Sequence, residues 1–167
     1  GMAGTLDCGR LVNILSRRLN VTPSKIKPAI IGPHNDDMIV LTRLTKVAGK
    51  TLSSLLNQND LSEVIRLTKE RGAYIVSLLG KGSAYFAPSQ AIFLMIESII
   101  KRKKNNFYIS CYLDGQYGLR DVCIGAPAII GENGIERIIE LALDKEEKRR
   151  LFDCAAKIKE TIETLGI

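Results

Sequence analysis

The chain contains one histidine, His34, and this residue is the natural candidate for moving a proton near neutral pH. No other unperturbed side chain titrates between about pH 5 and pH 8. Upstream, Asp7 and Arg10 are three residues apart, a spacing that places both side chains on one face of a helix. In such a group the aspartate can orient the imidazole, and the guanidinium can hold a carboxylate through two parallel hydrogen bonds. The chemistry would be proton transfer on a small organic acid.

The same three residues also have ordinary structural explanations. An aspartate and an arginine at this spacing are most often a surface ion pair that contributes about 0–1 kcal/mol to stability. A lone histidine after an apolar run, here Ile30 and Ile31, more often has a structural role. The residues alone therefore leave the site open between the two interpretations.

Length and composition predict one domain that needs no covalent cross-links. The chain has 167 residues, 46% of them hydrophobic, and a domain of this size buries roughly 70% of its unfolded surface. Four cysteines are present without a C-x-x-C pair: Cys8, Cys111, Cys123 and Cys154. We therefore expect no metal site, no disulfide framework, and reduced thiols in a cytoplasmic protein. No signal-peptide pattern and no apolar run of about 18 residues is present, so we expect no membrane partner.

The formal net charge of +6 is spread along the chain, apart from the basic run at residues 101–104. This run follows a long apolar helix pattern, where cations suit the negative end of the helix dipole. We interpret it as a solvated helix end, with nucleic-acid contact as the alternative. Because no nucleic-acid-binding motif accompanies it, we expect no nucleic-acid partner.

Hydrophobic periodicity predicts an α+β fold in which helices pack on short, mostly antiparallel strands. Residues 6–19 are expected to form the helix that carries Asp7 and Arg10, and residues 29–31 a short strand that delivers His34. Further elements are expected as extended pieces at residues 38–41, 107–113 and 135–141, a short helix at 52–56, and a last helix carrying Leu151, Ala155, Ile158, Ile162 and Leu165.

Two other helices are predicted from local signals. The Asp60-x-x-Glu63 spacing predicts a helix that starts at Asp60 and runs to residue 79, with a kink at Gly72. Residues 88–102 are apolar nearly all round, and we expect them to form the central buried helix.

A strand is expected at residues 121–130, followed by a turn at residues 131–134. Glycine weakens a strand interior and proline lacks an amide donor. We therefore expect this strand to be irregular or bulged at Gly125 and Pro127.

Five multi-residue segments, taken in order over the whole chain, carry a resemblance to a known family. They include the leucine–aspartate pair, Leu6 and Asp7, and the loop of His34. The segments are residues 1–10, 31–38, 82–88, 115–118 and 131–137. Together they resemble the C-terminal catalytic domain of the lactate/malate dehydrogenase family. Within that family the chain is most similar to the malate dehydrogenases of the lactate-dehydrogenase-like branch.

The resemblance implies a role for each candidate residue. His34 would take the hydroxyl proton as malate is oxidised and return it as oxaloacetate is reduced. Asp7 would accept the other ring N–H, and Arg10 would grip the carboxylate beside the reacting carbon. Ala84 would line the substrate pocket, although a small residue for close helix packing is an equal alternative. The implied hydride acceptor is NAD, and the implied reaction belongs to the tricarboxylic acid cycle.

The resemblance also implies that residues 1–167 form a single substrate-binding domain whose partner, an N-terminal Rossmann domain, is absent. The glycines at Gly131 and Gly134 lack the G-x-G-x-x-G spacing of a dinucleotide site, and the cofactor-binding residues stay unknown. We therefore expect the isolated chain to be inactive. We also expect an exposed apolar face, with the helix at residues 60–79 as candidate, and a homo-oligomer. The alternatives are a lactate or other 2-hydroxy-acid dehydrogenase domain, or a non-catalytic basic binding domain of the same fold.

The loop that carries His34 departs from the family pattern at three positions, Pro33, Asn35 and Asp37. Asparagine tolerates a positive φ better than most residues, so Asn35 can still form the turn. The carboxylate of Asp37 either points toward His34 or is a solvated loop side chain.

Overall fold

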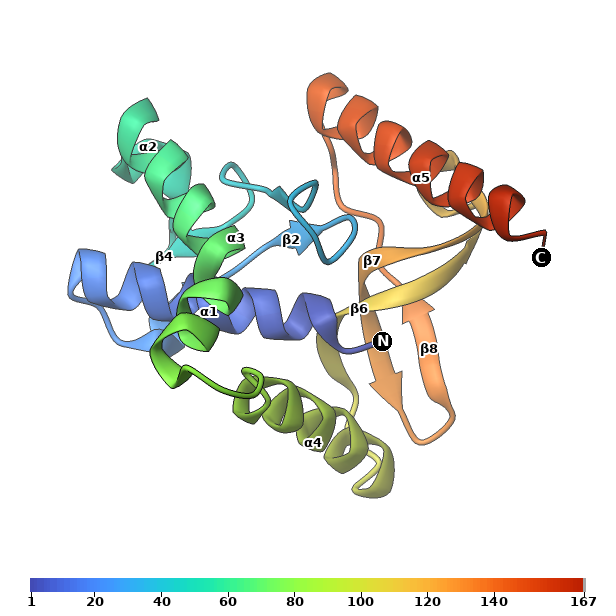
Figure 1. Ribbon diagram of the computed structural model, residues 1–167, viewed down its shortest axis with the longest axis horizontal. Helices are drawn as coiled ribbons and strands as arrows, with labels where there is room; N and C mark the ends of the chain where they lie inside the picture. The colour runs from blue at the N-terminus through green and yellow to red at the C-terminus, as the bar shows by residue number, and fades with distance from the viewer. Residues whose placement is uncertain (167) are drawn as a thin grey trace.

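The computed structural model describes residues 1–166, in which α-helices pack on small antiparallel sheets (Figure 1). The helices are α1 (Ala3–Leu19), α2 (Leu52–Leu55), α3 (Gln58–Leu79), α4 (Phe86–Ile100) and α5 (Lys145–Leu165), with 3-10 turns η1 (Pro23–Lys25) and η2 (Gln116–Gly118). The strands are β1 (Ile26–Lys27), β2 (Ile30–Ile31), β3 (Ile39–Val40), β4 (Lys46–Val47), β5 (Lys50–Thr51), β6 (Asn105–Asp114), β7 (Arg120–Gly131) and β8 (Gly134–Ile138). The predicted α+β class is confirmed.

The long antiparallel sheet β6–β7–β8 supplies one wall of the core, and α1 crosses the middle of the molecule beside it (Figure 1). The first turn of α1 lies against β6, where the hydroxyl of Thr5 donates a hydrogen bond to the carbonyl of Tyr108 at 2.9 Å. At Gly4 a Cβ atom would stand 2.7 Å from that same carbonyl oxygen. A glycine therefore lets the helix approach the strand closely, which fixes where the next turn of α1 points.

Two apolar clusters form the core, one against the β6–β7 hairpin and one around α1. The first lies between the β6–β7 hairpin, β2, β3 and α5, and the second between α1, the short strands, α2 and α3. Leu11 and Leu15 of α1 are fully buried in the second cluster, as the predicted periodicity of that helix requires. Tyr108 packs against both clusters.

The predicted start of α3 at Asp60 is wrong. The helix begins at Gln58, because the side chain of Asn57 accepts a hydrogen bond from the amide of Asp60 at 2.9 Å. Asparagine is among the best N-cap residues, since its short side chain reaches an orphan amide. Asp60 is instead an acid in the first turn. The helix continues through Gly72, where a kink is expected, and ends at Leu79.

The prediction that residues 88–102 form the central buried helix is wrong. Only Ala91 and Ser98 of α4 are buried, and large apolar side chains of this helix face outward: Phe86, Ile92, Phe93, Ile96, Ile99 and Ile100. Tyr74, Leu78 and Leu79 at the end of α3 are exposed as well, and the exposed side chains of both helices are called the exposed apolar surface below. Figure 1 shows α4 at the rim of the molecule, below α1.

The prediction of an irregular strand at Gly125 and Pro127 is also wrong. Pairing between β6 and β7 is continuous there, with Ser110 opposite Gly125 and Tyr108 opposite Pro127. The register shifts elsewhere: between Leu113 and Asp114 where β6 pairs with β7, and between Ile129 and Ile130 where β7 pairs with β8. Pairing with β8 begins only at residue 128, so Pro127 lies just outside that ladder.

The basic run after α4 is paired with acids. Lys101 and Lys103 contact Glu97, Arg102 contacts Glu132, and Lys104 contacts Glu136, all within 3.6 Å. The interpretation of this run as a helix end in solvent is therefore favoured over a free cationic surface for nucleic acid.

Candidate functional site

The structure brings Asp7, Arg10 and His34 together around one buried carboxylate. Asp7 is 1% exposed. Its Oδ2 lies 2.7 Å from Nδ1 of His34, and its Oδ1 lies 3.3 Å from Nη1 of Arg10. A buried carboxylate is costly unless it is paired and hydrogen-bonded. Here the two neighbours on either side of Asp7 satisfy that requirement.

The contact with Asp7 fixes the histidine tautomer. An ionised carboxylate can only accept, so Nδ1 of His34 carries the shared proton. The other ring nitrogen, Nε2, is then an acceptor when the ring is neutral. The side chain of His34 is 43% exposed, so a solute can reach the ring while Asp7 holds its orientation.

A pair of glycines sets the position of the histidine loop. Gly32 and Gly125 exchange two backbone hydrogen bonds, of 2.9 Å and 3.0 Å, which join the end of β2 to β7. Gly32 has a φ of +91°, a conformation open to glycine. A Cβ atom at Gly125 would stand well inside van der Waals contact of the Gly32 carbonyl oxygen. The close approach of these two backbones holds His34 two residues later.

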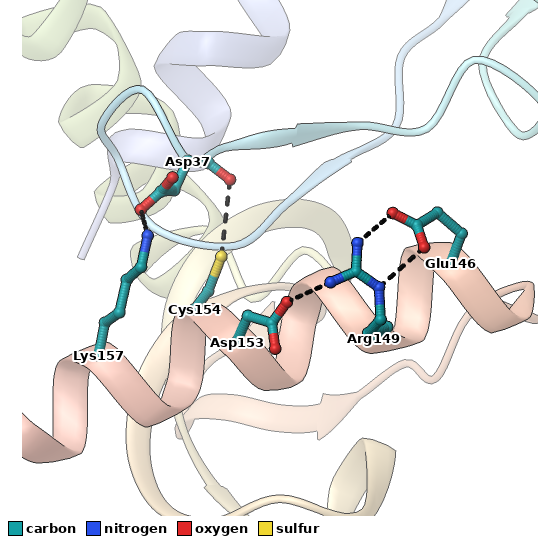
Figure 2. A network of polar contacts seen from close by, with 6 residues as sticks. All are labelled: Asp37, Glu146, Arg149, Asp153, Cys154 and Lys157. Carbon is teal, nitrogen blue, oxygen red and sulfur yellow. Dashed lines mark hydrogen bonds and ion pairs between the residues drawn. The ribbon is translucent and has the colours of Figure 1, made fainter.

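The far side of the loop is attached to α5. The carboxylate of Asp37 pairs with Nζ of Lys157 at 2.8 Å, and the Asp37 carbonyl lies 3.6 Å from Sγ of Cys154 (Figure 2). The Lys157 ammonium lowers the pKa of the Asp37 carboxyl, chiefly through this hydrogen bond. Asp37 is therefore committed to α5 rather than to His34.

The turn between His34 and Asp37 is closed by Asn35. Its side-chain oxygen accepts the amide of Asp37 at 2.8 Å, and its carbonyl accepts the amide of Met38 at 3.1 Å. The positive φ in this segment falls on Gly32 and not on Asn35. The ammonium of Lys69 on α3 donates to the carbonyl of Asp36, so the loop is tied to α3 as well as to α5.

Two cavities are lined by members of this group. One, of about 190 Å³, is lined by the histidine loop and by residues of α1 and β7, including Asp7, Pro33, His34, Cys123 and Gly125. The other, of about 390 Å³, lies between α1, α3 and α4 and is lined by Arg10, Asn13, Arg71, Ile75, Gln90 and Leu94 among others. His34 lines the first cavity and Arg10 the second, and Asp7 contacts both of these residues.

Arg10 is a buried cation with spare hydrogen-bonding capacity. Its side chain is 11% exposed, and its Nε atom has no hydrogen-bond partner among the described residues. A guanidinium carries five N–H donors, and a buried donor without a partner costs about 1–3 kcal/mol. This arrangement favours an acceptor, such as a carboxylate, entering the larger cavity.

Ala84 is not brought to this group. It is half-buried in the segment between α3 and α4 and lines neither of the two cavities. Residues that sequence reasoning missed are Arg71, which lines the Arg10 cavity, and Gly125, whose place in a strand interior is itself a signal of close backbone approach.

The buried thiols are not activated by their surroundings. All four cysteines are free. Burial raises the pKa of the Cys8 thiol, with a further contribution from the Asp7 charge, and burial raises the pKa of Cys111 to about 11. Reactive cysteines need the opposite shift.

Among residues 1–166, histidine, cysteine, aspartate and glutamate side chains form no group of three or more that could hold a metal ion. Over the same residues, every helix is too short or too polar to span a bilayer.

The chain is similar to known dehydrogenases in sequence and in structure. Residues 4–166 match the family model described as lactate/malate dehydrogenase, alpha/beta C-terminal domain. The malate dehydrogenase of Staphylococcus saprophyticus is 39% identical over 165 residues, which are 99% of this chain and 53% of that relative. The lactate dehydrogenase from Eimeria maxima with NADH and oxamate matches with a TM-score of 0.91 at 39% identity, over 98% of this chain and 52% of that one. The malate dehydrogenase from Salinibacter ruber gives 0.93 at 35% identity, over 98% and 53%.

The chain spans about half the length of the curated relatives it matches. The family model covers nearly every residue of it, and the solved structures share its fold at high similarity. The resemblance noted in the sequence is thereby confirmed. The chain belongs to the lactate/malate dehydrogenase family, and it matches that family's C-terminal domain.

Proposed function

We propose that these residues form the substrate-binding and proton-transferring domain of an NAD-dependent malate dehydrogenase, which interconverts (S)-malate and oxaloacetate. The observation that carries the proposal is the Asp7 carboxylate, which is buried and shared between the imidazole of His34 and the guanidinium of Arg10. A base held in one tautomer beside an anion-binding group is what the oxidation of a 2-hydroxy acid requires.

His34 acts as the general base and acid. In the oxidation direction, Nε2 accepts the hydroxyl proton of the substrate, and a hydride leaves the carbon that bears this hydroxyl. Asp7 keeps the ring oriented through Nδ1 and stabilises the imidazolium that results, because an opposite charge nearby favours the charged form. In the reduction direction, Nε2 returns the proton to the alkoxide oxygen. A positioned general acid or base contributes roughly 10²–10⁴-fold to the rate.

Arg10 binds the carboxylate next to the reacting carbon. Its Nε is buried and has no partner within residues 1–166, and a planar guanidinium donates two parallel hydrogen bonds to a carboxylate. A lysine at this position lacks that geometry, since its ammonium is a point charge. Ala84, as a small residue before α4, is proposed to leave room for the substrate once the complete site is assembled.

NAD is the proposed hydride acceptor, and its nicotinamide supplies the hydride chemistry when bound. The described residues do not fit the phosphate part of the cofactor. Gly131 and Gly134 form the turn between β7 and β8, so a strand follows them instead of the helix N-terminus that holds a pyrophosphate. We propose that the cofactor is held mainly by a Rossmann domain outside residues 1–167, and that these residues alone are inactive.

The preference for malate rests on the relatives, since curated proteins that are 38–39% identical to this chain bear that name. A lactate dehydrogenase is the second candidate, favoured by the match to the Eimeria maxima structure. We place the protein in the cytoplasm. The exposed apolar surface on α4 and the end of α3 is proposed to be covered by the N-terminal domain or by a second copy, giving a homo-oligomer.

The test is the oxidation of (S)-malate and of (S)-lactate with NAD by the complete protein that carries these residues. The rate is measured as the increase in NADH absorbance. We expect malate to be the better substrate by kcat/KM. A higher kcat/KM for lactate would move the assignment to the second candidate, and no turnover of either acid would refute the dehydrogenase proposal. The 167-residue chain measured beside it should give no NADH above background.

A further inference from the structure

We propose that Gly72 is a positioning residue for Arg10, in which the missing side chain on α3 makes room for the guanidinium. The catalytic consequence rests on the proposed function, whereas the contact itself does not. Gly72 lies well inside α3, a helix of 22 residues. Glycine is the poorest helix former after proline, so a helix interior gains nothing from it locally.

The reason for the glycine lies on the neighbouring helix. A Cβ atom built at Gly72 would stand 2.9 Å from Nη2 of Arg10 and 3.5 Å from its Cζ and Nη1. The first of these distances is too short for a carbon and a nitrogen that are not bonded. Gly9, the other glycine in a helix interior of this region, has nothing within 4 Å of the same built atom. Space is therefore required at one helical glycine and not at the other.

An added methyl group would displace Arg10 from its place beside Asp7. The guanidinium is the end of a flexible side chain, so it would yield before the backbone of α3 does. Its Nη1 lies 3.3 Å from Asp7 Oδ1, and the side chain lines the larger cavity, so any shift changes both the ion pair and the wall of that cavity. A Gly72→Ala variant should therefore fold normally and bind a carboxylate poorly.

Thermal unfolding of four chains tests the contact without any assay of activity. The chains are the wild type, Gly72→Ala, Arg10→Met and the double variant. In the Arg10→Met background, Gly72→Ala should raise Tm by about 2–4 °C, the value expected for relieving a helical glycine in a chain of this size. With Arg10 present, that rise should be lost or reversed. An equal rise in both backgrounds would overturn the proposal.

Gly9→Ala is the matched control for helix propensity. Because no atom lies near its built Cβ, it should raise Tm by the same amount whether residue 10 is arginine or methionine. A rise at residue 9 that depends on residue 10 would mean that the cycle reports something other than the Gly72 contact, and the proposal would fall with it.

Kinetics of the complete protein test the positioning role. Gly72→Ala should raise KM for the 2-hydroxy acid by roughly tenfold and change kcat little, because a contact made equally in the ground state and the transition state affects KM alone. If the effect of Gly72→Ala on Tm depends on residue 10 while KM is unchanged, the contact is only structural and the positioning role is overturned. If the wild type turns over neither malate nor lactate, the proposed function fails while the Tm cycle still decides the contact.

Discussion

The two sides of Asp7 are built in different ways. On one side His34 is half exposed, and its loop is tied to β7, α3 and α5 by backbone and side-chain contacts. On the other side Arg10 is almost buried, makes one contact with Asp7 and lines the larger cavity. Its Nε has no hydrogen-bond partner in the part of the chain that the structure describes. The histidine loop is held by hydrogen bonds and ion pairs within the protein, whereas Arg10 keeps a donor for a ligand. Orienting the proton carrier therefore uses hydrogen bonds that the protein makes itself, and binding the anion uses one that it leaves open.

The largest effect is expected on the histidine side. His34→Asn keeps a side chain that can donate to Asp7 but removes the titrating nitrogen, so kcat for malate oxidation should fall by roughly 10²–10⁴-fold. KM and Tm should change little. Steady-state NADH formation by the complete protein measures this, with Tm as the control for folding. Retention of kcat within a factor of two would refute the role of His34.

The arginine side should respond in KM and kcat/KM. Arg10→Lys keeps the charge and loses the planar pair of donors, so kcat/KM should drop roughly 10–100-fold, in line with about 1.5–3 kcal/mol for hydrogen bonds to a charged group. The comparison predicts that this variant and His34→Asn differ in kind, with KM raised only in the lysine variant. If both variants lowered kcat alone, the division between the two sides would be wrong.

The support of the histidine loop can be broken at Gly125. Gly125→Ala places a methyl group against the Gly32 carbonyl, and such overpacking costs about 1–3 kcal/mol. Urea unfolding of the chain should show that loss. Gly9→Ala, where the built Cβ meets nothing within 4 Å, should instead stabilise the chain by up to about 1 kcal/mol. Equal stability of wild type and Gly125→Ala would contradict the close approach.

The smallest expected effect concerns the attachment of the loop to α5. The pKa of Asp37 is lowered in the folded chain by Lys157, so its contribution to stability is present above the unfolded pKa and is lost as pH falls through the lowered folded value. Asp37→Asn should therefore unfold at a lower Tm than the wild type at pH 7. The difference should narrow as pH falls below about 4. A difference in Tm that stays constant from pH 7 to about pH 2 would contradict the pairing, and Lys157→Met should behave as Asp37→Asn does.

Local sequence patterns predicted helices and turns that depend on neighbouring residues. They failed for features that depend on contacts between residues far apart in the sequence. The periodicity of residues 6–19 gave α1 to within three residues of its start, and the turn at residues 131–134 is present. The apolar content of α4 did not reveal that most of it faces outward, because composition carries no information on what a helix packs against. The strands β1, β4 and β5 have two residues each, too few for an alternating pattern to register.

The candidate site shows the same division. The spacing of Asp7 and Arg10 placed them on one helix face, but the contact with His34 joins residues 27 apart in the sequence. The residue types made that contact one of two open interpretations, and the resemblance favoured it. The bridge between Gly32 and Gly125 joins segments still further apart. Its local sign, a glycine in a strand, was read as a bulge, although the same sign also fits a close approach of two backbones.

The most direct test of the account is a crystal structure of the complete protein with oxamate, an unreactive analogue of a 2-oxo acid. The account predicts that the carboxylate of oxamate pairs with both terminal nitrogens or with Nε of Arg10, and that its carbonyl oxygen lies within hydrogen-bonding distance of His34 Nε2 while Nδ1 stays on Asp7. Oxamate bound away from Arg10, or an imidazole turned from Asp7 in the complex, would contradict it.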